Sequence, residues 1–343
     1  MEQREKRVCM IATGGTIASS ESGEGLAPRL RPADILRRLH FPAGLCRVET
    51  AEVCRIDSTD VTPAHWLAMA AAIRERYDAY DGFVVLHGTD TMAYTAAALS
   101  YLVQRSPKPV VLTGAQRPID RESTDSHANL SDAFRYACAD ASCGVQIVFD
   151  GRVIPGTRAR KVRTKSFHAF ASINYPELAV LCDGQLLRYV EEPKPDGPVF
   201  YDTLNPRVSL LKLIPGVDAA LLGFLLARND AVIVESYGVG GVPTAGGFCE
   251  RIAEAANGGK TVVMTTQVPN EGSDIGLYRV GSRLKGVPGV LEAYDMTTEA
   301  VVTKLMWILG QTQARDEIRR LFYTPVAHDI LYPGCLLYTS DAA

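Results

Sequence analysis

The fold is decided by a stretch near the start of the chain, Val-Cys-Met-Ile-Ala-Thr-Gly-Gly-Thr-Ile-Ala-Ser, residues 8–19. Its apolar first half predicts a buried strand. The strand ends in Thr-Gly-Gly-Thr, where two glycines allow a sharp bend and a close approach of the backbone to a ligand. Ligands of open α/β sheets bind outside the carboxyl ends of the strands. A hydroxyl placed there is a candidate nucleophile, and a phosphate-binding loop is the alternative.

A second stretch is built in the same way, Gly-Phe-Val-Val-Leu-His-Gly-Thr-Asp-Thr-Met, residues 82–92. It places Thr89 and Asp90 after another apolar strand. The phosphate alternative loses ground because neither stretch contains the P-loop or the dinucleotide-binding pattern. A serine hydrolase would need Gly-x-Ser-x-Gly, which we do not find. Threonine chemistry remains, and a threonine hydroxyl needs an adjacent base, which a lysine held by a carboxylate can supply.

Composition narrows the class of protein. The chain has 343 residues, 47% of them apolar, which is enough for about two domains with cores of their own. The formal net charge is −3 without a long basic run, which argues against nucleic acid as a partner. No apolar run reaches the length of a membrane span, and the N-terminus does not resemble a signal peptide. The eight cysteines form no Cys-x-x-Cys motif, which predicts free thiols in a reducing cytosol and no structural zinc.

Strands and helices are expected to alternate in two series, which predicts an α/β fold with parallel sheets covered on both faces. In the first series we expect strands at 48–56, 82–86, 109–113 and 145–149, and helices at 32–39, 63–77, 91–104 and 127–139. In the second we expect strands at 208–214, 231–236 and 261–266, and helices at 217–227, 247–256, 298–309 and 316–322. Residues 20–28 predict a surface loop over the first strand end. The predicted domains are a larger N-terminal one at 1–189 and a smaller C-terminal one at 208–343. They are joined by a proline-rich linker at 190–207, and a disordered tail begins near residue 333.

Together the two stretches resemble the two signatures of the asparaginase/glutaminase family, and the resemblance to its cytoplasmic-type (type I) members extends to about Phe322. It implies a two-domain α/β amidohydrolase that needs no metal or other cofactor. It implies hydrolysis of L-asparagine to L-aspartate and ammonia through a threonine acyl-enzyme. It also implies a cytoplasmic homodimer or homotetramer, because members of the family assemble their active sites between subunits.

The resemblance also assigns roles to residues of this chain. Thr16 is the nucleophile, and the activating group is Thr89, Asp90 and Lys161, with Lys165 as the other candidate lysine. The cluster Asp57, Ser58 and Thr59 binds the α-carboxylate and amino group of the substrate, and Asp90 pairs with its ammonium. Backbone N–H groups near Gly15, Thr89 and Ala115 are candidates to stabilise the oxyanion.

Each role has a structural alternative. Thr16 can cap a helix, Asp90 and Thr91 stand where a helix N-cap is expected, and residues 57–59 can be turn residues. Lys161 can be one of several surface cations, because residues 151–174 are rich in Arg and Lys. For His87 we expect a packed, hydrogen-bonded residue rather than a base.

One position departs from the family pattern, because Leu26 stands where many relatives carry a tyrosine that contacts the nucleophile. Tyr278 and Tyr294 are candidates to replace it. Three other functions stay open: a glutaminase-asparaginase of broader specificity, the amidase subunit of a tRNA-dependent amidotransferase, and a non-catalytic amino-acid-binding protein. We expect weaker glutaminase activity, since a pocket must refuse one methylene by its shape. We also expect no room in the chain for the N-terminal module usual in the amidotransferase subunit.

Overall fold

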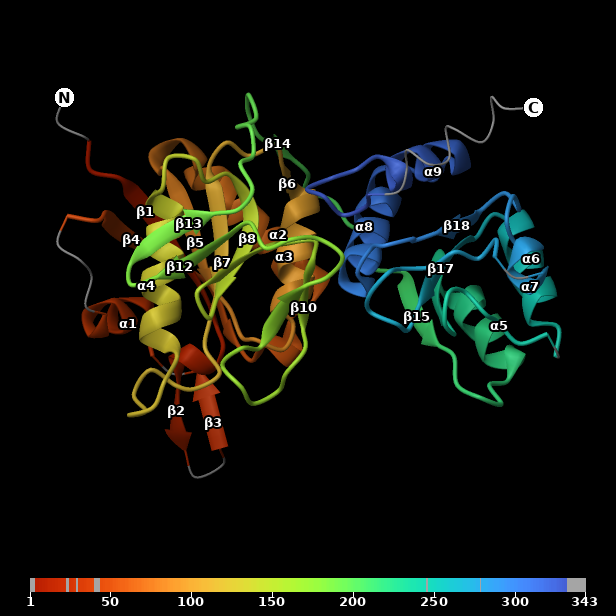
Figure 1. Cartoon of the computed structure of the whole chain (residues 1–343), viewed down its shortest axis with the longest axis horizontal. Helices are drawn as coiled ribbons and strands as arrows, with labels where there is room; N and C mark the ends of the chain where they lie inside the picture. Colours follow the sequence, from red (N-terminus) through yellow and green to blue (C-terminus); the bar gives the residue numbers. More distant parts are fainter. Residues whose placement is uncertain are drawn as a thin grey trace. The chain divides into compact units, whose positions relative to one another are not determined.

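The computed structural model describes residues 4–22, 25–28, 30–39, 44–244, 246–277 and 279–331. It divides into two compact units, Met1–Asp202 and Thr203–Ala343. Each unit is built on a sheet of its own, one large and one small (Figure 1). The α/β class with a larger and a smaller domain is therefore confirmed.

The sheet of the first unit has eight strands in the order β13-β12-β9-β8-β7-β5-β1-β4. Five neighbouring strands are parallel, as expected: β1 (Arg7–Gly14), β4 (Arg47–Ile56), β5 (Gly82–Leu86), β7 (Pro109–Thr113) and β8 (Gly144–Phe149). Three short antiparallel strands extend it: β9 (Arg152–Pro155), β12 (Ala179–Cys182) and β13 (Gln185–Arg188). This extension was not predicted, because strands of four residues are too short for a period-two pattern to identify them.

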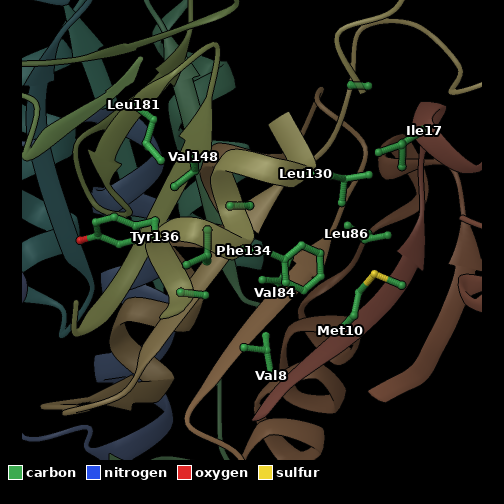
Figure 2. Packing of buried hydrophobic residues seen from close by; sticks show 14 of the residues in the cluster. Val8, Met10, Ile17, Val84, Leu86, Leu130, Phe134, Tyr136, Val148 and Leu181 are labelled. Atoms are coloured by element: carbon green, nitrogen blue, oxygen red, sulfur yellow. The ribbon is translucent and has the colours of Figure 1, made fainter. Parts of the chain in front are cut away.

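Helices cover both faces of this sheet, as the alternation predicts. On one face, α1 (Pro32–Arg38) and α4 (Ser126–Cys138) enclose a core in which Leu130 and Phe134 of α4 lie beside Met10 of β1 and Leu86 of β5 (Figure 2). Successive residues of a strand point to opposite faces, so Cys9 and Ile11 face the other layer. That layer contains α2 (Pro63–Arg76) and α3 (Met92–Leu102).

Several short elements depart from the expected boundaries. The helix expected at 91–104 ends at Leu102, because Val103–Gln104 (β6) pair with Val199–Phe200 (β14). The loop expected at 20–28 is a hairpin of β2 (Ser19–Ser22) and β3 (Gly25–Pro28), visible beyond the sheet in Figure 1. Its polar sequence has no apolar alternation to indicate strands. A second hairpin follows β9 and consists of β10 (Ala159–Lys161) and β11 (Phe170–Ser172). The described part of this unit also contains three 3-10 turns: η1 (Thr16–Ala18), η2 (Ser58–Asp60) and η3 (Tyr77–Ala79).

The second unit has a parallel sheet in the order β15-β16-β17-β18. Its strands are β15 (Val208–Lys212), β16 (Ala231–Ser236), β17 (Thr261–Thr266) and β18 (Val290–Glu292). Its helices are α5 (Ala219–Arg228), α6 (Phe248–Asn257), α7 (Arg279–Ser282), α8 (Thr298–Gln311) and α9 (Arg315–Tyr323). Leu222, Phe248 and Ile252 lie in its core.

Two general properties of the chain can be checked on the described residues. The seven cysteines among them are free thiols, and Cys335 lies outside the described residues. None of the described helices has both the length and the apolar character needed to cross a membrane.

A buried ion pair lies in the second unit. Lys304 of α8 donates from Nζ to Asp329 Oδ2 at 2.6 Å and to the Thr324 carbonyl at 2.9 Å, and both charged side chains are fully buried. Asp329 also accepts from the Val326 amide at 2.9 Å. Burial lowers the pKa of Lys304, and Asp329 opposes that shift. The pair ties the segment after α9 to α8.

We expect Lys304→Met to destabilise the second unit by about 3–5 kcal/mol, because it leaves the Asp329 carboxylate buried without its cation. Guanidinium unfolding followed by circular dichroism measures the change. Arg320→Ala is the control, since it removes an exposed, solvent-screened ion pair with Glu317 and is expected to leave the stability almost unchanged. Equal effects of the two substitutions would contradict the stabilising role of the buried Lys304–Asp329 pair.

Candidate active site

The site is built where three strand ends of the first unit touch. Gly15 follows β1 with φ +80°, and a Cβ at this position would lie 2.4 Å from the Gly88 backbone nitrogen. A Cβ on Gly88, after β5, would lie 2.6 Å from the Ser58 hydroxyl oxygen, after β4. Real Cβ atoms do not approach other atoms so closely. Glycine at these two positions therefore lets the loops after β1, β5 and β4 lie in direct contact.

Hydroxyl groups hold these strand ends together. Thr13 donates to the Leu86 carbonyl at 2.7 Å, which links β1 to β5. Thr91 donates to the Ser58 carbonyl at 2.7 Å, which links the loops after β5 and β4. Thr91 occupies the N-cap position of α3, but its side chain makes no capping bond. Thr91 is thus the N-cap residue, as expected, but its hydroxyl links two loops instead of capping the helix.

Thr16 lies at the first position of η1, directly after Gly15, and is half-buried. Within the described ranges it makes no hydrogen bond to Thr89, Asp90 or Lys161. The Gly15 N–H donates to the Ile56 carbonyl at 3.1 Å, so this N–H is already used in the fold. An oxyanion donor near Gly15 would therefore have to be a neighbouring group.

Lys161 joins the two polar residues that follow β5. Its Nζ donates to Thr89 Oγ1 at 2.7 Å and to Asp90 Oδ1 at 2.6 Å. Thr89 is buried and the Lys161 side chain is 15% exposed, whereas that of Asp90 is 59% exposed. The predicted group of Thr89, Asp90 and Lys161 is thus brought together. Lys165 is exposed in the loop between β10 and β11.

The hairpin of β10 and β11 carries Lys161 to this position. Gly156 lies at its base, where a Cβ would be 2.7 Å from the Ser100 hydroxyl oxygen of α3, so the chain passes close to that helix. Phe170, which pairs with Lys161 across the hairpin, packs edge-on against Phe149 of β8 with ring centroids 5.1 Å apart. Packing against both α3 and the sheet fixes the lysine.

The cluster at 57–59 forms a turn. Asp57 Oδ1 accepts from the Thr59 amide and from the Thr59 hydroxyl, both at 2.9 Å, and so caps η2. Ser58 is buried beneath it. The structural alternative is therefore present in this cluster, and the substrate-binding role stays a prediction. Ala115 lies buried after β7, at the same edge of the sheet.

Sequence reasoning missed two residues of this site, Gln116 and Asp125. Thr89 donates from its hydroxyl to Gln116 Oε1 at 3.1 Å. Both oxygens of the buried Asp125 carboxylate accept from the Gln116 backbone N–H, at 2.9 and 3.0 Å. The signal for Gln116 was available, because it is a polar residue directly after an apolar strand, as Thr89 is. Asp125 stands nine residues further on and no sequence pattern marks it.

The residues considered at the position of the family's tyrosine lie in different parts of the chain. Leu26 belongs to β3, and Tyr278 lies outside the described residues. Tyr294 packs against Tyr323 within the second unit, with ring centroids 6.1 Å apart, and burial raises the pKa of its hydroxyl.

The geometry suits proton transfer at a hydroxyl. A lysine held by a carboxylate lies within hydrogen-bond distance of a buried threonine, an arrangement in which a base can take a hydroxyl proton. Among the residues that the structure describes, no cluster of His, Cys, Asp or Glu could hold a metal ion.

His87 lies beneath the site and is fully buried. Its Nδ1 lies 2.7 Å from the Gly88 carbonyl, and a carbonyl only accepts, so Nδ1 carries the proton. Its Nε2 then accepts from the Thr95 hydroxyl at 2.9 Å, and Thr95 accepts from the Trp66 indole N–H at 2.9 Å. The expectation of a packed, hydrogen-bonded residue is confirmed. Burial is the main reason that the pKa of His87 falls to about 4.

Comparisons with known proteins give the family. Residues 7–194 match the model described as Asparaginase, N-terminal, and residues 207–322 match the Glutaminase/Asparaginase C-terminal domain. The L-asparaginase of Thermococcus kodakarensis is 38% identical over 331 residues, which cover 94% of this chain and 99% of that one. Its solved structure superposes with a TM-score of 0.89, covering 95% of this chain and 99% of that chain.

Two further relatives show how widely the family ranges. L-asparaginase 1 of Escherichia coli K12 is 34% identical over 92% of this chain and 96% of its own length. A glutamyl-tRNA(Gln) amidotransferase subunit of Pyrococcus furiosus is 33% identical over 94% of this chain and 76% of its own length. Fold and family matches thus define an amidohydrolase. The chain belongs to the asparaginase family, with both of the family's domains.

We expect stability to depend on the charge state of His87. Because its folded pKa of about 4 lies below the ordinary value of 6.5, its contribution is fully present above pH 6.5. The contribution is lost as the pH falls from 6.5 to 4, by about 3 kcal/mol in total. Urea unfolding at a series of pH values measures this loss. His87→Asn, which keeps a donor for Gly88, should flatten the curve between pH 6.5 and 4, and an unchanged slope would contradict the assignment.

Proposed function

We propose that the protein is an L-asparaginase that hydrolyses L-asparagine to L-aspartate and ammonia. The observation that carries the proposal is the contact of Lys161 with both Thr89 and Asp90, at the edge of the sheet where Thr16 stands. The asparaginase relatives, 34–38% identical over nearly the whole chain, support the substrate.

In this mechanism the Thr16 hydroxyl attacks the side-chain amide carbon of the substrate. Its proton passes to the leaving nitrogen, ammonia departs and an acyl-enzyme remains, which water then hydrolyses. Lys161, aligned by Asp90, takes the Thr89 proton, which lets Thr89 take a proton from the water that attacks the acyl-enzyme. The proton on Lys161 then passes to the Thr16 oxygen as the acyl bond breaks. The substrate lies between Thr16 and the cluster at 57–59, where Asp57 and Asp90 offer carboxylates to its ammonium.

The proposal extends to compartment and assembly as the sequence predicts them. The free thiols among the described residues suit a reducing cytoplasm. A homodimer or homotetramer is the assembly that the family resemblance implies. Glutaminase activity is expected to be the weaker activity of the same site.

We expect Thr16→Ala to reduce ammonia release from L-asparagine by at least about 10³-fold, because the acyl-enzyme cannot form. Thr16→Ser keeps a hydroxyl and should retain measurable activity. The assay is ammonia release from L-asparagine and L-glutamine by the full chain, with folding checked by circular dichroism. If the folded wild type releases no ammonia from either amide, the proposal fails, and a partner-dependent amidase or a binding protein takes its place.

We expect Lys161→Met to lower kcat by about 10²–10⁴-fold with little change in KM, since the lysine acts on a proton rather than on substrate binding. Asp90→Asn should also raise KM, because the substrate ammonium loses a charged partner. Lys165→Met is the matched control and should match wild type. Loss of activity in Lys165→Met with full activity in Lys161→Met would reverse the assignment of the lysine.

A further inference from the structure

The Gln116 side chain bridges two parts of the site. Its Oε1 accepts from the Thr89 hydroxyl at 3.1 Å, and its Nε2 donates to the Ser166 carbonyl at 3.1 Å, in the loop between β10 and β11. A backbone carbonyl can only accept, so the amide nitrogen must face Ser166. The amide oxygen therefore faces Thr89, and the orientation of the carboxamide follows from chemistry.

The bridge fixes the direction of the hydrogen bonds at Thr89. A charged lysine has donors and no lone pair, so Thr89 Oγ1 must accept from Lys161 Nζ across their 2.7 Å contact. The single proton of the hydroxyl then points to Gln116. When Lys161 is neutral it has a lone pair that can accept this proton, and Gln116 and Lys161 then compete for it.

Gln116 is held rigidly enough to act in this way. Its backbone N–H and that of Arg117 both donate to the buried Asp125 carboxylate, Arg117 at 3.1 Å. Asn129 donates to the same carboxylate at 3.1 Å. The Arg117 guanidinium stacks on Phe167 at 5.4 Å, next to Ser166, and so fastens the loop between β10 and β11 a second time.

We infer that Gln116 is a positioning residue that holds the Thr89 hydroxyl toward itself and thereby sets the pH at which Lys161 can take the Thr89 proton. The inference rests on the proposed function. The Gln116 carboxamide acts on Lys161 only through Thr89. Substitutions of Gln116 should therefore move the pH dependence of activity, to lower or to higher pH according to the new side chain.

Other charged groups near Lys161 stay constant when residue 116 is changed. Asp90 contacts the lysine directly. The packed helix α3 contributes only tyrosines, Tyr94 and Tyr101, among titratable groups. The loop between β10 and β11 adds Arg163, Lys165 and His168. Arg163 donates to the His168 carbonyl, and the His168 ring contacts Asp150. Arg160 precedes Lys161 in β10.

Two substitutions at residue 116 should have opposite effects. Gln116→Leu cannot accept from Thr89, which frees the hydroxyl to donate to a neutral lysine. The acid limb of the kcat/KM profile should move about half to one pH unit lower, as expected for one lost hydrogen bond. Gln116→Glu places a carboxylate within about 6 Å of the ammonium, which favours the charged lysine, so the limb should move about one unit higher.

A second readout does not require turnover. The pH dependence of acetylation of Lys161 by acetic anhydride, followed by peptide mass spectrometry, should move in the same two directions. If wild type shows no ammonia release but the acetylation profiles separate, the proposed function fails and this inference stands. If activity is present and neither profile moves, the inference fails and the function stands.

The matched controls are Gln104→Leu and Gln104→Glu. Gln104 lies in β6 and donates to the Tyr101 carbonyl at 3.1 Å, away from the strand ends of the site. Both controls should keep the wild-type profile. A purely structural role of Gln116 would make both of its variants lose activity and thermal stability together with an unmoved pH limb, and that result overturns the inference.

Discussion

The site depends on one steric constraint, the contact between the backbones of Gly15 and Gly88. A single methyl group at either position would have to occupy space held by backbone atoms or by the Ser58 side chain. Because the two strands β1 and β5 are parallel neighbours, their carboxyl ends already lie at one edge of the sheet. Removing both side chains brings the following loops to van der Waals distance, so Thr16 and Thr89 are placed by backbone rather than by flexible side chains.

The charged part of the site comes from a different kind of structure. Lys161 stands on a short antiparallel hairpin outside the parallel core, and its position depends on packing against α3 and Phe149. The lysine is nearly buried, whereas its partner Asp90 is largely exposed. An exposed carboxylate keeps part of its hydration and can exchange its contact with the lysine for one with a substrate cation. A fully buried partner, as Asp329 is for Lys304, cannot exchange its contact with the lysine for one with a substrate and has a structural role only.

The sequence predicted the parts of this architecture that follow from strong periodicity. The strands β5, β7, β16 and β17 agree with the expected ranges at both ends, and α1, α4, α5 and α8 agree within a few residues. The parallel arrangement then explains why the predicted polar residues after β1, β4 and β5 share one edge. The hairpin that carries Lys161 could not be predicted in this way, because strands of three residues leave no pattern. Only the family resemblance indicated Lys161, and nothing local distinguished it from the neighbouring cations. The position of Gln116 after β7 could have indicated it, but its contact with Thr89 depends on the Asp125 carboxylate at the far end of the same loop, which no sequence pattern marks.

The same edge of the sheet is crowded with threonines, and their hydrogen bonds separate structural from chemical roles. Thr13, Thr91 and Thr113 each donate to a backbone carbonyl of a neighbouring strand or loop, which uses their protons to hold the edge together. Thr89 instead accepts from an ammonium and donates to a carboxamide. A hydroxyl whose proton is bound by a carbonyl within the fold gains nothing from a nearby base. A hydroxyl between a lysine and an exchangeable amide acceptor can change partners when the lysine changes charge, and this ability is what distinguishes Thr89 from the threonines around it.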